Sequence, residues 1–167
     1  MMVAVKSVKI DGQDIHIFNS AIYIFESSSG TSLELDMIVS EVTVLKYNKE
    51  ENLIVEIELE DGRIINSIMH LKVFAGGLPQ LNLYFDLDDV DEYKDFDIVT
   101  ENGTSFPSIE EGITLEKIRK VEMPDQDIRL KLKLPIDQVE WLQKLKKREL
   151  EELLKEMIYE YWRNEGK

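Results

Sequence analysis

Residues 52–74, NLIVEIELEDGRIINSIMHLKVF, carry the clearest structural pattern in the chain. Between Leu53 and Glu60, aliphatic residues alternate with mainly acidic ones, which is the period of a strand with one buried face. Asp61-Gly62 follows, and this pair accepts the positive φ angles of a tight turn. A second apolar-rich run then extends from Arg63 to Phe74. The stretch therefore predicts a β-hairpin that covers a core with one face.

Strand patterns also lie on both sides of this hairpin. They cover residues 3–10, 15–25, 33–45, 81–87 and 128–134. The run from Ile15 to Phe25 is apolar on both faces, as expected of a central strand that is covered on both sides. The alternation that begins at Leu33 changes phase near Ser40, which predicts a bulge or bend in the strand. Residues 114–122 fit either a bulged strand or a two-turn helix.

The C-terminal part of the chain has the pattern of an amphipathic helix. Asp137 and Glu140 follow Pro135, and carboxylates with this spacing can accept from the free N–H groups of a helix N-terminus. We expect one helix of roughly 39 Å, from about Gln138 to Arg163. Four aromatic residues, three of them off its apolar stripe, are candidate interaction residues: Trp141, Tyr159, Tyr161 and Trp162.

These patterns together predict an α+β protein that is mainly β. We expect an antiparallel β-barrel or sandwich of about 7–9 strands, followed by one long C-terminal amphipathic helix. Residues 1–134 would form the β-rich part, and residues 135–167 would form a helix that packs on it or on a partner subunit. A chain of 167 residues is expected to make one structural domain overall.

Composition excludes several classes of function. The chain has no Cys, so it has neither disulfides nor thiolate metal sites, which fits a cytoplasmic protein. Its net charge is −14, with 26 acidic and 13 basic residues before residue 135, so direct contact with nucleic acid or anionic lipid is disfavoured. No apolar run is long enough to predict a membrane span or a signal peptide.

The densest cluster of possible metal ligands is acidic. Its members are Asp86, Asp88, Asp89 and Asp91, and hard cations need several such oxygens to converge. A calcium loop that starts at Asp86 would need Gly where Asp91 stands, so that motif does not match. The cluster therefore predicts either a metal site or a solvated acidic loop that protects a sheet edge.

Two histidines are candidate ligand-binding residues. His16 and His70 both fall in apolar strand patterns. Each could be an acid–base group, or the two could share a metal ion if their strands were neighbours. The alternative is a hydrogen-bonded structural histidine in each place.

Among functional motifs, the sequence has no nucleophile elbow, phosphate loop or dinucleotide fingerprint. We therefore predict a non-enzymatic protein-interaction or structural module without a cofactor, in which the C-terminal helix contacts a protein partner or a second copy. One alternative is a barrel that binds a small ligand or a metal ion, either as a binding protein or as an enzyme. Its site would use His16 and His70 or the carboxylates of residues 86–91. A second alternative is an acidic nucleic-acid mimic, in which the row Glu56, Glu58 and Glu60 and the acidic run from Asp86 to Asp97 stand in place of phosphates.

Overall fold

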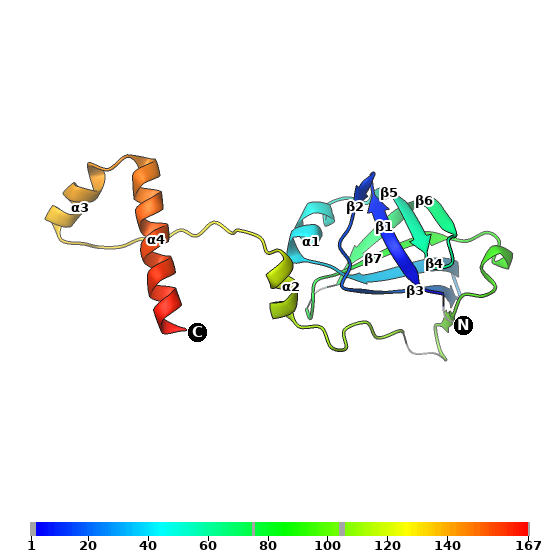
Figure 1. Ribbon diagram of the computed structural model, residues 1–167. Coiled ribbons are helices and arrows are strands. Elements are labelled where there is room, and N and C mark those ends of the chain that lie inside the picture. Colours follow the sequence, from blue (N-terminus) through cyan, green and yellow to red (C-terminus); the bar gives the residue numbers. More distant parts are fainter. Residues whose placement is uncertain (1–2, 75, 104–105, 167) are drawn as a thin grey trace. The chain divides into compact units, whose positions relative to one another are not determined.

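The computed structural model describes residues 3–74, 76–103 and 106–166, and the chain divides into two units (Figure 1). The first unit is Met1–Asp125 and the second is Gln126–Lys167. In chain order the elements are β1 (Val5–Ile10), β2 (Gln13–Asp14), β3 (Asn19–Ser27), β4 (Gly30–Ile38), α1 (Glu41–Tyr47), β5 (Asn52–Leu59), β6 (Ile64–Val73), β7 (Gln80–Asp86), the 3₁₀ turn η1 (Asp91–Tyr93), β8 (Ile98–Thr100), α2 (Leu115–Val121), α3 (Ile136–Gln143) and α4 (Lys147–Glu165).

The first unit is built on a single eight-stranded sheet in the order β2-β1-β5-β6-β7-β4-β3-β8. Every neighbouring pair is antiparallel except β3 and β8, which run parallel. In the described part of the chain the two edge strands do not pair with each other, so the predicted closed barrel is wrong, and one sheet replaces the predicted sandwich. Alternation shows which face of a strand is buried, but it says nothing about whether the edges of the sheet meet.

The predicted hairpin at residues 52–74 is confirmed and forms part of the main core. β5 pairs with β6 from Asn52↔His70 to Glu58↔Ile64. The inward-facing side chains of β5 are at most 1% exposed, and they pack with residues of β1, β3, β4, β6, β7 and α1 in one cluster. Because strands from both halves of the sheet share this cluster, the sheet curves around it, and Figure 1 shows β1 crossing over β3.

β3 is covered on both faces, as its pattern predicts. Ile22 and Ile24 belong to the main core, whereas Ala21 packs against a second cluster on the opposite face. The buried members of this second cluster are Ile38, Ile109 and Ile118. Ile118 lies in α2, whose N-cap Thr114 accepts a hydrogen bond from the backbone N–H of Lys117 at 3.2 Å. Of the two alternatives for residues 114–122, the helix is therefore the one that forms.

The predicted strand from Leu33 to Leu45 is wrong after residue 38. β4 ends at Ile38 and α1 begins at Glu41. Ser40 caps this helix, because its side chain accepts from the backbone N–H of Thr43 at 3.1 Å. The change of phase near Ser40 thus marks a strand-to-helix transition and not a bulge.

The second unit contains two helices in place of the single predicted one. α3 ends at Gln143 and α4, with 19 residues, begins at Lys147. The break has a local cause, because the Glu149 carboxylate accepts from the backbone N–H of Lys146 at 3.1 Å and so starts a new helix there. A long C-terminal helix is confirmed, but its continuity with residues 136–143 is not.

The predicted strand at residues 128–134 is also wrong. These residues alternate as a strand would, but they pair with no strand in the described part of the chain. Ile128 is 82% exposed and Leu130 is 74% exposed. Alternation alone does not make a strand, because the backbone also needs a partner for its ladder hydrogen bonds.

Among the described helices, none combines the length and apolar content that crossing a bilayer requires.

The second cluster gives a prediction about stability. Ile118→Ala should lower the free energy of unfolding by about 2–5 kcal/mol, because Ile118 is fully buried and the change leaves a cavity. Val121→Ala is the matched control on the same helix: Val121 is 54% exposed, so its loss should cost less than about 0.5 kcal/mol. Urea unfolding of both variants measures the difference. Equal costs would contradict the packing of α2 on the outer face of the sheet.

Candidate functional site

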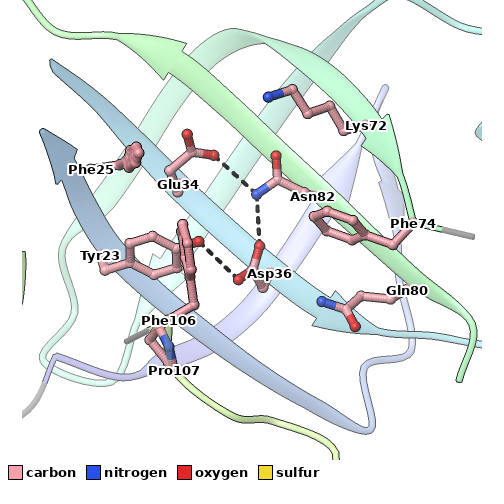
Figure 2. Close-up of a pocket in the computed structure, with 10 residues that line it drawn as sticks. All are labelled: Tyr23, Phe25, Glu34, Asp36, Lys72, Phe74, Gln80, Asn82, Phe106 and Pro107. Carbon is pink, nitrogen blue, oxygen red and sulfur yellow. Dashed lines mark hydrogen bonds between the residues drawn. The ribbon is translucent and has the colours of Figure 1, made fainter. Parts of the chain in front are cut away.

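A pocket with polar side chains on its floor lies on the outer face of β3, β4, β7 and β6, opposite the main core (Figure 2). Its position follows from strand alternation: Leu33 and Leu35 point into the core, so Glu34 and Asp36 point outward. The pocket has a volume of about 370 Å³. Its lining residues are Tyr23, Phe25, Glu34, Asp36, Lys72, Phe74, Gln80, Asn82, Phe106 and Pro107.

Strand register brings the polar side chains of this pocket together. Asp36 of β4 stands opposite Asn82 of β7, and Asn82 stands opposite Lys72 of β6. One step along the sheet, Glu34 stands opposite Tyr23 of β3. Side chains in such cross-strand positions lie close enough to interact directly.

These side chains form a connected hydrogen-bond network on the floor of the pocket. Tyr23 Oη donates to Asp36 Oδ2 at 3.0 Å. Asn82 Nδ2 donates to Asp36 Oδ1 at 2.7 Å and to Glu34 Oε2 at 3.0 Å. Ser32 Oγ donates to Glu34 Oε1 at 2.8 Å. Asn82 therefore uses its amide group to hold the two carboxylates side by side.

Burial changes the acidity of the network. Asp36 is 5% exposed and Asn82 is 3% exposed. Burial raises the pKa of Asp36, although hydrogen bonds from Asn82 and Tyr23 oppose this change. Burial also raises the pKa of Glu34, against the hydrogen bonds from Asn82 and Ser32 and the charge of Lys72. Burial, and then the charge of Asp36, raise the pKa of Tyr23.

Aromatic rings flank the carboxylates. Phe106 stacks on Phe25 with ring centroids 5.6 Å apart, and it meets Tyr23 edge-on at 6.0 Å. Figure 2 shows Phe106 and Tyr23 on one side of Asp36 and Phe74 on the other. The site is thus a cavity with two carboxylic side chains on its floor and aromatic rings at its sides, and the burial of carboxylates in such a cavity is a feature typical of functional sites.

The predicted ligand residues His16 and His70 do not line this pocket. His16 lies between β2 and β3 and contacts Phe18, with ring centroids 4.7 Å apart. His70 lies in β6 and contacts Tyr84 at 5.3 Å. The neighbours of β6 are β5 and β7, so the two histidines are not on neighbouring strands.

The predicted metal ligands follow β7. Asp86 ends that strand, Asp88 and Asp89 follow it, and Asp91 begins η1 and pairs with Lys94 at 3.6 Å. Among the described residues, no three side chains of the metal-binding types converge. The metal site thus stays a prediction.

The acidic row of β5 is partly neutralised by β1. Lys6 pairs with Glu58 at 3.2 Å, and Lys9 lies 3.9 Å from Glu56. Two carboxylates of the row thus face cations of their own sheet, which is a poor imitation of a phosphate backbone. The nucleic-acid mimic stays a prediction that these contacts do not favour.

The predicted interaction residues all lie in the second unit. Trp141 is 55% exposed, Tyr159 54%, Tyr161 71% and Trp162 52%. The rings of Tyr159 and Trp162 lie 6.0 Å apart. Neither α3 nor α4 contains a buried residue.

The pocket residues were missed by the sequence analysis, although one signal for them exists. Glu34 and Asp36 alternate with buried leucines, which indicates a solvated face, yet Tyr23 belongs to a strand that is apolar on both sides. A doubly covered strand beside an acidic face predicts buried carboxylates if the two strands are neighbours. The pairing of β3 with β4 supplies that condition.

No protein-family model matches this chain, and neither the curated proteins nor the solved structures include a match to it.

The raised pKa of Asp36 predicts a pH dependence of stability. At pH values between the ordinary pKa of an aspartate and the raised pKa of Asp36, the carboxyl group of Asp36 is protonated to a greater extent in the folded state than in the unfolded chain. This contribution to stability is complete at low pH and is lost as the pH rises through the raised pKa. Asp36→Asn should remove the loss, so the stability of the variant relative to the wild type should increase between about pH 3, below the ordinary pKa of an aspartate, and about pH 8.

Urea unfolding at the two pH values measures this change. Glu60→Gln is the control, because Glu60 is an exposed carboxylate outside the pocket and its replacement removes the same charge. A relative stability of Asp36→Asn that does not change with pH, or that changes as it does for Glu60→Gln, would contradict the prediction.

Proposed function

We propose that this chain is a non-enzymatic protein-interaction module in which the second unit, Gln126–Lys167, is the contact element. One observation carries the proposal: α3 and α4 contain many large apolar side chains and no buried residue. Leu154, Met157 and Ile158 are 46%, 58% and 65% exposed. Apolar surface of this kind on a helix is typical of a surface that a partner covers.

The apolar surface of α4 is arranged as a seam. Leu150, Leu154, Met157 and Tyr161 follow one another at intervals of four, three and four residues. This is the heptad spacing with which two helices pack against each other. At 100° per residue, Tyr159 lies on the side of α4 opposite the seam and Trp162 lies part-way round the helix. Most of the stability of a helix in a protein comes from the packing of its apolar face, so a partner helix would also stabilise α4.

The charge distribution favours a second copy of the chain as the partner. Residues 126–167 contain 9 acidic and 10 basic residues, whereas residues 1–125 contain 25 acidic and 10 basic residues. Two first units would therefore repel each other, but two second units would not. Self-association through α4 is the form of the proposal that these charges support.

Removal of the second unit should separate association from folding. A chain that ends at Asp125 keeps every member of both apolar clusters, so it should unfold at about the same temperature as the first unit does in the full chain. In light scattering, the full chain should have a mass at least twice that of one chain, whereas the shortened chain should have the mass of a monomer. A full chain that stays monomeric as its concentration is raised would overturn the proposal.

The seam can be tested without shortening the chain. Leu154→Glu together with Met157→Glu should give a monomer, because charged carboxylates would have to enter a desolvated helix–helix contact. Lys155→Glu is the matched control, since it changes the net charge by the same amount at a position off the seam. Sedimentation analysis compares the two, and association that survives the double change would contradict the seam.

A further inference from the structure

We propose that the pocket on the outer face of β3, β4, β7 and β6 binds an organic ammonium group carried on an apolar stem, with Asp36 as its counterion. This inference does not depend on the contact role of α4, because every lining residue of the pocket belongs to the first unit.

Asp36 is a carboxylate that is 5% exposed and forms no ion pair with a residue in the described part of the chain. Its hydrogen-bond donors, Tyr23 and Asn82, are both neutral. Glu34 differs, because the nearby charge of Lys72 stabilises its ionised form. A buried carboxylate without a countercharge is costly, and an ammonium group from outside would supply the missing charge.

The carboxylate of Asp36 also has free hydrogen-bonding capacity. An ionised carboxylate can accept about four hydrogen bonds, and Tyr23 and Asn82 provide one to each oxygen. Both donors come from the strands that flank β4, so they fix the orientation of the carboxylate in the floor of the cavity. An ammonium group, which has three donors and no acceptor, complements the remaining sites.

The aromatic walls fit the rest of such a ligand. Phe106 and Phe74 lie on opposite sides of Asp36 (Figure 2), and their faces attract cations and pack against methylene groups. A volume of about 370 Å³ lies in the range of small-molecule sites.

Lys72 gives the pocket a direction. Its Nζ lies 4.8 Å from the centroid of the Tyr84 ring, at the end of the pocket beside Glu34. Lys72 would repel the ammonium group of the ligand at that end of the pocket. The ammonium group therefore belongs at Asp36, and the apolar stem extends between Phe74 and Phe106. The excess of acidic residues in the first unit would attract a cation from solution.

The test compares three probes of equal length on the full chain: n-hexylammonium, n-hexanol and hexanoate, titrated by calorimetry at about 0.15 M salt. We expect one saturable site for n-hexylammonium, with an affinity at least about tenfold above that of n-hexanol, and no binding of hexanoate. The side-chain amide signal of Asn82 in NMR spectra should shift with the same saturation. Equal affinity for n-hexanol, preference for hexanoate or no saturable binding would each overturn the proposal.

Two substitutions locate the site. Asp36→Asn should lower the affinity for n-hexylammonium at least about tenfold, whereas Glu60→Gln, which removes an exposed charge, should leave it unchanged. Phe106→Ala is a second variant that does not depend on the buried network, because Phe106 is 58% exposed and belongs to neither apolar cluster. It should weaken n-hexylammonium several-fold. Unchanged affinity in either pocket variant would refute the assignment.

Discussion

The strict alternation of β4 between β7 and β3 is the constraint on which the rest of the first unit depends. Its odd-numbered residues from Leu33 to Met37 are fully buried in the main core, so Glu34 and Asp36 must occupy the opposite face. A shift of register by one residue would place two carboxylates in the core. The same alternation thus stabilises the sheet and places two carboxylic side chains in the pocket that β3, β7, Phe106 and Pro107 help to line.

The enclosed network imposes a cost that the apolar clusters offset. Asp36, Glu34 and Asn82 lose hydration when the chain folds. The hydrogen bonds among their side chains replace only part of the lost interactions with water. Replacement of buried charged groups by well-packed apolar side chains is often neutral or stabilising. The presence of these polar groups in a cavity of the first unit is the physical basis for the proposed ligand.

Several elements could be predicted from sequence because their information is local. The hairpin of β5 and β6 has a turn pair between two apolar runs, and α4 has a long amphipathic stripe. The errors arose where a pattern needed a partner or had a second local solution. Residues 128–134 alternate but pair with no strand in the part of the chain that the structure describes. The side-chain oxygen of Ser40 caps one helix, and the Glu149 carboxylate helps to begin another.

By itself, the sequence determined the mainly β composition, the turn at Asp61-Gly62, the exclusion of cysteine chemistry and the concentration of negative charge in the first unit. Only the tertiary structure decided the order of the strands in the sheet and the formation of the pocket. Tyr23, Asp36, Asn82 and Phe106 are distant in the chain and meet only because β3, β4 and β7 are neighbours in register. The physical reason is that hydrophobic periodicity specifies a buried face residue by residue, whereas strand neighbours are selected by the packing of the whole core.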